Sequence, residues 1–528
     1  MGSLRLCLVG SEQQENLGLR YLAAAAEQAG HDVTVVSMEG RAELATAAAA
    51  VKAAEPALVG LNMAFQHTVD DYLELARRLR EQGFTGHLTC GGQVPTFNHS
   101  QLLDEEPALD TAVRFEGETT LVELLDALAA GRPPADLPGL VWREDGVPVV
   151  GPPRPLCGRL DELPVPKRQP EPFRIGGVPM AFVITGRGCP SDCSYCCLNA
   201  FTRAAGGASL RLRDPEAVAA EIAALRTERG VRVLVLQDDV FILPSERRAI
   251  ERMDAIGAAL RRRGIDDVLF WAKGRPDDIT APVLEAARRL GVIHLFLGVE
   301  HAVAERLRYL GRSHQPADNQ RALQLCADHG IRPSFNLMLF DPDCALEDVA
   351  ATIDFGAEHL QATWNICRTE IYSGTRLRDR LEAEGRLVGT YRSYGYQIRD
   401  ERAEVMFRVL RASMQERAFA CDSVINRVIS LSFARQVQLA LFPGGSADAL
   451  SRFVDELRDD LYGDTVAVLR QALALAAEAD LSDRAAIHEA TAALALEVAR
   501  RDGLLGQRAD DLWQRLTVRG TMGLAREP

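Results

Sequence analysis

The sequence predicts an α/β protein with two successive strand–helix alternations and a helical C-terminal part. Short apolar runs alternate with helix-like patterns over residues 4–130 and again from about residue 178. Beyond about residue 399 the chain is rich in Ala, Leu, Glu and Arg and has no clear strand pattern. Strand–helix alternation is typical of parallel sheets covered by helices, so we expect two parallel sheets followed by a helical domain.

Length and charge limit the classes of protein that this chain can represent. Its 528 residues are too many for one hydrophobic core and indicate several domains. The composition, 47% hydrophobic and 25% charged, is that of an ordinary globular protein. The net charge of −14 gives no electrostatic support to nucleic-acid binding.

The N-terminal residues and the cysteines predict a cytoplasmic protein. The first ten residues match a strand better than a secretory signal, and no apolar run is long enough to cross a membrane. The eleven cysteines are odd in number, and eight of them are widely scattered. This distribution argues for a reducing compartment without a disulfide framework.

The first alternation predicts a Rossmann-like domain over residues 1–135. Its expected strands lie at residues 4–10, 32–38, 57–63, 87–92 and 111–117, with helices such as 17–30 and 69–82 between them. Ligands of such sheets bind at the carboxyl ends of the strands. Residues 136–177 are rich in proline and predict a linker, with a hairpin near residues 141–150.

The second alternation predicts a partial, TIM-like (β/α)6 barrel over residues 178–390. Its expected strands lie at residues 180–186, 231–237, 268–272, 292–298, 333–340 and 362–368. A complete barrel would need two more strand–helix units, and active sites on such folds lie at the carboxyl ends of the strands. Residues 391–528 are expected to form a helical C-terminal domain.

Three cysteines with C-x3-C-x2-C spacing, Cys189, Cys193 and Cys196, follow the first strand of the second alternation. Thiolates are ligands for iron–sulfur clusters or zinc. A structural zinc site takes four ligands, whereas three thiolates on a four-iron cluster leave one iron open to a substrate or cofactor. The alternatives are three ordinary buried cysteines or a zinc loop completed by a distant histidine. We interpret the adjacent Cys197 as a packing residue.

This motif, with Tyr195 before its last cysteine, resembles the cluster-binding motif of the radical S-adenosylmethionine superfamily over about residues 178–387. The resemblance implies that Cys189, Cys193 and Cys196 bind a [4Fe–4S] cluster whose open iron is chelated by S-adenosylmethionine. One electron, from a flavodoxin- or ferredoxin-type donor, would then cleave the cofactor to methionine and a 5′-deoxyadenosyl radical.

The resemblance also implies contacts to S-adenosylmethionine after later strands. Asp239 lies near the position that meets the methionyl amine, although the family often has Gly-Gly-Glu there. Lys273 and Arg275 follow the third strand and are expected to clamp a carboxylate. Glu300 closes a Gly-x-Glu segment whose glutamate meets the ribose. The alternative for each is a solvated charge in a loop.

The first domain resembles the cobalamin-binding domain of the B12-dependent branch of this superfamily. The motif Asp-x-His-x-x-Gly, which supplies a lower histidine to cobalt in other B12 proteins, is absent, and residues 11–18 take its place. We therefore expect a cobalt without that ligand and a nucleotide tail buried in the sheet. The alternatives are a solvated His67 and a Rossmann-like domain that binds no ligand. The expected contacts come from loops after the third, fourth and fifth strands: Gln66, His67, Gly91, Gly92, Gly117 and Glu118.

The resemblance implies a methyltransferase that moves a methyl group from S-adenosylmethionine through methylcobalamin to a carbon of a small molecule. Analogy with the family suggests natural-product or antibiotic biosynthesis. The alternatives are a B12-dependent cyclase or rearrangement enzyme and an accessory protein without catalysis. No catalytic residue is assigned. Residues 368–375, Tyr394, Tyr396 and Arg427 are expected to border or close the substrate pocket.

Overall fold

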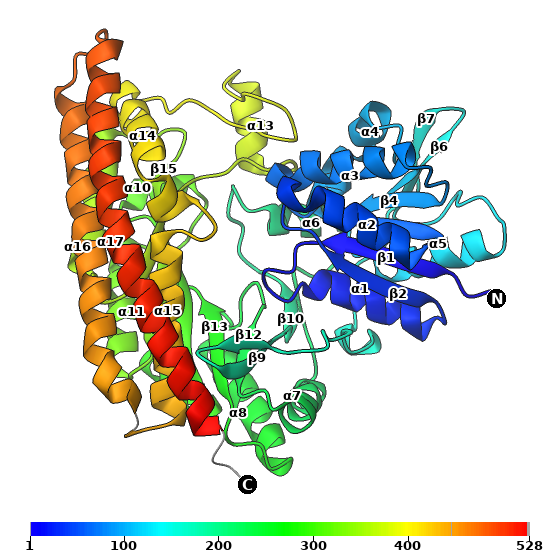
Figure 1. Ribbon diagram of the computed structural model, residues 1–528, viewed down its shortest axis with the longest axis horizontal. Coiled ribbons are helices and arrows are strands. Elements are labelled where there is room, and N and C mark those ends of the chain that lie inside the picture. Colours follow the sequence, from blue (N-terminus) through cyan, green and yellow to red (C-terminus); the bar gives the residue numbers. More distant parts are fainter. Residues whose placement is uncertain (1, 445, 525–528) are drawn as a thin grey trace. The chain divides into compact units, whose positions relative to one another are not determined.

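The computed structural model describes residues 2–444 and 446–524, which fall into two compact units (Figure 1). Unit 1 comprises Met1–Glu171, Gly186–Asp214 and Glu370–Tyr396, and unit 2 comprises the remaining segments. The units therefore interleave along the chain, whereas the sequence suggested consecutive domains. The exact domain boundaries stay a prediction.

Unit 1 is built on a seven-stranded sheet of order β2-β1-β3-β4-β5-β6-β7. The first five of these strands are parallel, and the β6–β7 hairpin extends the sheet antiparallel to β5. The strands are β1 (Arg5–Gly10), β2 (Asp32–Ser37), β3 (Leu58–Asn62), β4 (His87–Gly91), β5 (Thr111–Val113), β6 (Leu140–Glu144) and β7 (Val147–Val150). The proline-rich segment is thus partly a sheet edge, because its hairpin supplies strands to the first sheet.

Helices cover both faces of this sheet, as the strand–helix alternation predicted. The helices are α1 (Leu17–Gln28), α2 (Leu44–Ala54), α3 (Val69–Glu81), α4 (Gln93–Glu105) and α5 (Glu118–Ala129), with short 3-10 turns at Arg41–Glu43, Gln66–Thr68 and Leu160–Glu162. One core lies between the sheet and α2 and α3, and a second lies between the sheet and α1 and α5. Unit 1 also contains β10 (Gly186–Gly188), α6 (Cys197–Ala205), β11 (Leu210–Leu212) and α13 (Arg376–Ala383).

Unit 2 contains the partial barrel. Its sheet has the order β16-β15-β14-β13-β12-β9-β8, in which six strands are parallel and β8 is antiparallel. The strands are β8 (Phe173–Ile175), β9 (Val178–Val183), β12 (Val233–Leu236), β13 (Leu269–Gly274), β14 (Val292–Glu300), β15 (Arg332–Phe340) and β16 (Thr363–Arg368). The count of six parallel strands confirms the predicted partial barrel.

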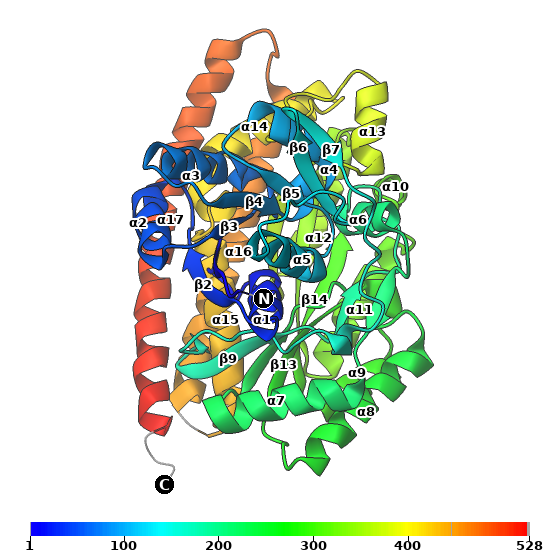
Figure 2. The same ribbon diagram turned by 90° about the vertical axis from the view of Figure 1, so that its right-hand side faces the viewer.

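Helices connect these strands, and α8 packs against both α7 and α9 (Figure 2). They are α7 (Pro215–Arg229), α8 (Glu246–Arg262), α9 (Ala281–Leu290), α10 (Ala304–Tyr309), α11 (Pro316–Asp328) and α12 (Leu346–Glu358), with a 3-10 turn at Pro276–Asp278. The C-terminal part of unit 2 is helical, as predicted: α14 (Glu401–Ser413), a π-helical turn (Gln415–Phe419), α15 (Val424–Leu441), α16 (Ser446–Glu478) and α17 (Arg484–Leu524). Within the described residues no helix is long and apolar enough to cross a membrane.

Candidate functional site

The cysteine motif begins at a hairpin that the sequence did not reveal. β10 pairs antiparallel with β11, and Cys189 follows the last residue of β10. Gly188 has a φ of +93°, and a Cβ at this position would lie 2.1 Å from the carbonyl oxygen of Ser209. Only glycine fits this position, because a side chain would collide with the partner strand. Glycine therefore sets the geometry with which the chain enters the cysteine loop.

The three motif cysteines occupy one loop and the start of one helix. Cys193 is buried, with 5% of its surface exposed, and Cys196 immediately precedes α6. Burial raises the pKa of the Cys196 thiol to about 12, and the neighbouring Cys197 and Cys193 add to this effect. Thiols in such a setting become thiolates when positive metal ions compensate their charge. The chemistry of the loop therefore fits an iron–sulfur cluster.

A site for a single metal ion is the alternative to an iron–sulfur cluster at the cysteine loop. In the described part of the chain, no group of three or more His, Cys, Asp or Glu side chains converges on one ion position. An iron–sulfur cluster binds each thiolate through a different iron, so its ligands surround a larger body. Cys197 is half-buried at the first position of α6, and its carbonyl oxygen accepts a hydrogen bond from Nε2 of Gln93 at 3.3 Å.

Arg187, inside the short strand β10, ties the cysteine loop to the loop after β5. Its Nη1 donates to Glu116 at 3.0 Å and its Nη2 donates to Glu118 at 2.7 Å. Burial lowers the pKa of Arg187, but Glu118 and Glu116 outweigh it, so that the net pKa is raised. Arg211 of β11 pairs with the same Glu116 at 2.9 Å. The β10–β11 hairpin is thus fixed to the first sheet by charge-assisted hydrogen bonds from both of its strands.

The 370–396 segment holds the cysteine loop from another direction. The backbone N–H of Leu377 donates to the carbonyl oxygen of Ser194 at 2.9 Å, and Arg376 pairs with Asp192 at 2.8 Å. The same segment contacts α4, because a Cβ on Gly374, whose φ is +77°, would lie 2.4 Å from the ring of Phe97. This segment includes residues 370–375, Tyr394 and Tyr396, which are among those expected to border the substrate pocket, and it connects the cysteine loop with the helix that follows β4.

The loop after β3 exposes aromatic side chains at the carboxyl end of the first sheet. Phe65 is 56% exposed, and its ring stacks on that of His67 at 5.7 Å between centroids. Gln66 and His67 form a 3-10 turn, and His67 is exposed. An exposed aromatic pair at this edge offers a flat apolar surface, which suits a large planar macrocycle such as a corrin. Ligation of cobalt by His67 stays a prediction.

Glycines bring the loops of the first sheet close together. Gly92 has a φ of +111°, and a Cβ there would lie 3.0 Å from the backbone of Met63. Gly91 ends β4, and a Cβ on Gly117 would lie 3.2 Å from Leu22. The neighbouring Glu118 is buried and paired with Arg187. Contacts of Gly91, Gly92, Gly117 and Glu118 with a cofactor stay predictions.

In unit 2, the two acidic residues after β12 differ in environment. Asp238 is buried and accepts hydrogen bonds from the backbone N–H of Thr185 at 2.6 Å and from its hydroxyl at 2.5 Å. It therefore joins the ends of β9 and β12. Asp239 is half-buried, and its contact with S-adenosylmethionine stays a prediction. The sequence could not separate the two, because only the strand pairing decides which carboxylate is used internally.

The two basic residues after β13 also differ. Arg275 is engaged by Asp277, with Nε to Oδ1 at 3.0 Å and Nη2 to Oδ2 at 2.8 Å. Lys273 is half-buried and forms no side-chain hydrogen bond or ion pair among the described residues. A ligand carboxylate would therefore meet a free ammonium at Lys273 and a partly neutralised guanidinium at Arg275.

Glu300 occupies a strained position at the end of β14. Its φ is +64°, which is unusual for a residue with a side chain, and the register of β14 against β15 shifts at this point. Its carboxylate lies 3.7 Å from Nη2 of Arg312. A Cβ on Gly298 would lie 2.5 Å from that guanidinium nitrogen and 3.0 Å from Glu300. The Gly-x-Glu spacing thus makes room for the Glu300–Arg312 pair.

The predicted residues therefore separate into two groups. The cluster cysteines and the residues expected to contact cobalamin belong to unit 1, whereas Asp239, Arg275 and Glu300 belong to unit 2. Arg187, Arg211 and Arg312 were not predicted from the sequence. A usable signal was present for Arg187 alone, since it lies inside the Gly-Arg-Gly segment that precedes the motif.

Family models match both halves of this arrangement. The model of the B12 binding domain matches residues 8–125, and the model of the radical SAM superfamily matches residues 183–356. The chain belongs to the cobalamin-dependent radical S-adenosylmethionine enzymes. Cobalamin, S-adenosylmethionine and a [4Fe–4S] cluster are accordingly its cofactors, as predicted. The fold class predicted from the sequence is confirmed as well.

The relatives of this radical SAM enzyme include proteins named as methyltransferases and a protein named as a cyclase. A protein of Pyrococcus horikoshii named as an uncharacterized methyltransferase is 31% identical over 68% of this chain and 77% of its own length. The anaerobic magnesium-protoporphyrin IX monomethyl ester cyclase of Synechocystis is 29% identical over 61% of this chain and 64% of its own. The hopanoid C-3 methylase of Methylococcus capsulatus is 28% identical over 62% and 61%. The chain thus spans less than two thirds of the latter two relatives.

Solved structures share the fold at low sequence identity. The cobalamin-dependent S-adenosylmethionine radical enzyme OxsB, with aqua-cobalamin and S-adenosylmethionine bound, matches 98% of this chain and 84% of its own at a TM-score of 0.68 and 16% identity. The methyltransferase TsrM of Kitasatospora setae, with cobalamin and a [4Fe–4S] cluster bound, matches 72% and 75% at a TM-score of 0.56 and 21% identity. The OxsB match extends through the C-terminal helices of this chain.

Proposed function

We propose that this radical SAM enzyme is a methyltransferase that moves a methyl group from S-adenosylmethionine through cobalamin to a carbon of a small-molecule substrate. Cobalamin supplies a carrier for the methyl group, and the cluster with S-adenosylmethionine supplies a route to a carbon radical. The names of two relatives and of one solved structure support methyl transfer. Attachment to carbon, and a role in natural-product biosynthesis, are part of the proposal.

The observation that carries the proposal is the attachment of the cysteine loop to the cobalamin-binding domain. Arg187 and Arg211 bind the hairpin before the cysteines to Glu116 and Glu118, all within unit 1. Transfer of a group between two cofactors requires that both be held in a fixed arrangement. A hairpin fixed by three buried ion pairs supports such an arrangement.

The test uses anaerobically reconstituted holoenzyme and S-adenosylmethionine labelled in its methyl group. We expect label in protein-bound cobalamin and, with a cognate substrate, in a carbon-methylated product. Absence of label from both cobalamin and product, while deoxyadenosine still forms, would refute methyl transfer. The absorption spectrum of the purified protein, which reports cluster and corrinoid together, is the control for cofactor loading.

A second candidate function is a B12-dependent cyclisation or rearrangement without methyl transfer. The similarity to cyclases named for magnesium-protoporphyrin IX monomethyl ester supports it. The same assay separates the two functions, because a cyclase would form deoxyadenosine and leave no labelled methyl group in its product. An accessory protein without catalysis would bind the cofactors and cleave no S-adenosylmethionine.

We further propose that a flavodoxin- or ferredoxin-type protein supplies the electron. Cleavage of S-adenosylmethionine supported by such a protein and its reductase, compared with a chemical reductant, tests this. Failure of the protein donor while the chemical reductant still supports cleavage would contradict it.

A further inference from the structure

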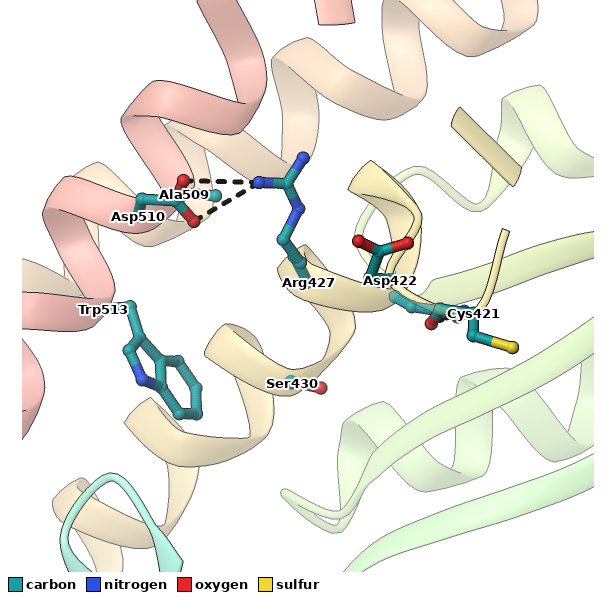
Figure 3. A pocket seen from close by; sticks show the side chains of 8 residues that line it. Cys421, Asp422, Arg427, Ser430, Ala509, Asp510 and Trp513 are labelled. Atoms are coloured by element: carbon teal, nitrogen blue, oxygen red, sulfur yellow. Dashed lines mark hydrogen bonds and ion pairs between the residues drawn. The ribbon is translucent and has the colours of Figure 1, made fainter. Parts of the chain in front are cut away.

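The C-terminal helices of unit 2 line an open pocket of about 380 Å³ (Figure 3). Of the residues predicted from the sequence to border or close the substrate pocket, Arg427 lies in its wall. Residues from α15, from the turn before it and from α17 form its walls. A volume of this size is suited to a small organic molecule. All of the residues that line it belong to unit 2.

The side chains of α15 that face the barrel are polar near the start of the helix and apolar in its second half. Ala434 and Val437, in its second half, pack on Val178 and Val233 at the start of the barrel strands. Near the beginning of α15, Asn426 instead accepts a hydrogen bond from Asn365 of β16 at 3.3 Å. The apolar half packs on the first residues of β9 and β12, and the polar half contributes Asn426 and Arg427 to the cavity wall.

Asn365 belongs to the concave side of the barrel sheet. Its neighbour Trp364 is fully buried against Tyr462 of α16, with ring centroids 4.6 Å apart. Successive side chains of a strand point to opposite faces, so Asn365 faces away from α16 and toward α15. Asn426 of the cavity wall is therefore hydrogen-bonded to the face of the barrel sheet that α15 covers.

α17 supplies the opposite wall through positions spaced three or four residues apart. Ala509, Asp510 and Trp513 line the cavity, and Gly506 lies one turn before them. A Cβ on Gly506 would lie 2.8 Å from Nη2 of Arg427. Glycine at this position therefore leaves room for the guanidinium between the two helices.

The charged groups of the cavity are incompletely paired. Nη1 of Arg427 lies 3.3 Å from both carboxylate oxygens of Asp510, which is longer than the 2.7–2.9 Å of a strong charge-assisted hydrogen bond. Nε of Arg427 is buried and has no hydrogen-bond partner. Asp422 lines the cavity and forms no hydrogen bond or ion pair with any described residue. One guanidinium thus has unused donor capacity, and one carboxylate is available as an acceptor.

We propose that this cavity binds a zwitterionic ligand with an α-amino-acid head and a flat apolar body. Arg427 would bind the carboxylate, Asp422 would bind the ammonium, and Trp513 would pack on the flat body. Asp510 would keep Arg427 in place between the helices. The proposal that this ligand class is the substrate class of the enzyme rests on the proposed function. The proposal that the cavity binds such a ligand does not.

The first experiment measures equilibrium binding to the anaerobic holoenzyme by calorimetry. The probes are L-tryptophan, tryptamine, indole-3-propionate and indole, which carry both charges, the ammonium only, the carboxylate only and neither charge. We expect L-tryptophan to bind tightest and each singly charged probe to bind about tenfold more weakly, because each loses one charged hydrogen bond. Equal affinity for all four probes, or binding of none, would overturn the proposal.

Single substitutions then assign the two charges. Arg427→Gln is expected to weaken L-tryptophan and indole-3-propionate about tenfold and to leave tryptamine unchanged, and Asp422→Asn is expected to do the reverse. Gly506→Ala keeps every charge but displaces the guanidinium, so it should act like Arg427→Gln in weaker form. The matched control is Arg508→Gln, which removes a cation from α17 that pairs with Asp460 outside the cavity. Equal effects of Arg427→Gln on all probes would contradict the assignment.

The two proposals fail in different ways. Binding that follows the expected pattern, with no labelled methyl group in any product, would leave the cavity assignment intact and refute the proposed methyl transfer. Methyl transfer that Arg427→Gln and Asp422→Asn leave unchanged, in a folded and cofactor-loaded enzyme, would refute the cavity as the substrate site.

Discussion

The two parallel sheets of this enzyme present different chemistry at the carboxyl ends of their strands. The first sheet exposes the aromatic pair Phe65 and His67, and its charged residues after β5 are used to hold the cysteine hairpin. The barrel sheet carries charged side chains that are partly paired with one another, such as Arg275 with Asp277 and Glu300 with Arg312. The first sheet thus uses its charges to attach the hairpin, whereas the charges of the barrel sheet lie where S-adenosylmethionine contacts are predicted.

We propose that this difference reflects the cofactors predicted to bind at the two sheets. A corrin is large and flat and is best met by apolar and glycine-rich loops. S-adenosylmethionine is small and charged and requires carboxylates, cations and hydrogen-bond donors. The same α/β edge therefore serves two cofactors through a different choice of loop residues.

The largest expected effect concerns the cysteine loop itself. Cys193→Ala should abolish the iron–sulfur absorption and reduce cleavage of S-adenosylmethionine to the level found without protein, because a cluster ligand is lost. Cobalamin binding should remain, since the first sheet keeps its own cores. Cys197→Ala, one residue beyond the motif, is the control. Loss of the cluster in this control as well would contradict the assignment of three ligands.

The attachment of the hairpin is tested by Arg187→Met. This change removes Arg187 as a partner of Glu116 and Glu118, which are mostly buried. The free energy of unfolding should therefore fall by about 3 kcal/mol. Chemical denaturation measures the change. Arg5→Met removes an exposed pair with Glu55 and should cost less than about 1 kcal/mol. Equal costs for the two variants would contradict a specific role for the hairpin.

The same network predicts a pH dependence. Burial raises the pKa of Glu116, but Arg211 and Arg187 outweigh it, so the folded-state pKa is lowered. A carboxylate with a lowered pKa contributes stability above its ordinary pKa and loses this contribution as the pH falls through the folded value. The difference between wild type and Arg187→Met should therefore shrink in acid, which denaturation at several pH values measures.

The charged edge of the barrel is tested by Gly298→Ala. The added Cβ would lie 2.5 Å from the Arg312 guanidinium and should displace it from Glu300. We expect the dissociation constant for S-adenosylmethionine to rise about tenfold, because one charged contact is misplaced. Gly463→Ala is the control, since a Cβ there meets nothing within 4 Å. Unchanged affinity for Gly298→Ala would argue against Glu300 as a ligand contact.

The smallest expected effect concerns Asp278, next to the Arg275 pair. Burial, followed by repulsion from Asp277, raises the pKa of Asp278 to about 6. Because the pKa of this carboxyl group is raised in the folded state, the protein loses stability as the pH rises from the ordinary pKa of an aspartate toward 6. Asp278→Asn should therefore stabilise the protein by about 1 kcal/mol at pH 8 and have little effect near pH 4. A stabilisation that is the same at both pH values would contradict this cause.

The sequence by itself determined the architecture, and it predicted the cluster ligands. The alternation of apolar runs is a local property, and it located the first sheet, the six parallel barrel strands and the helical end. The spacing of Cys189, Cys193 and Cys196 is equally local, because three ligands in one loop need no folding to come close.

Only the tertiary structure decided which charged residues are already engaged. Asp238 and Asp239 are equivalent in sequence, and the hydrogen bonds from Thr185 engage Asp238. The Gly-Arg-Gly segment marks Arg187 in the sequence, but its partners could not be predicted because they lie 71 and 69 residues away. The cavity between α15 and α17 likewise depends on Gly506 and Arg427, which meet only when two distant helices pack. Periodicity and spacing report local geometry, whereas pairing between distant side chains is set by packing.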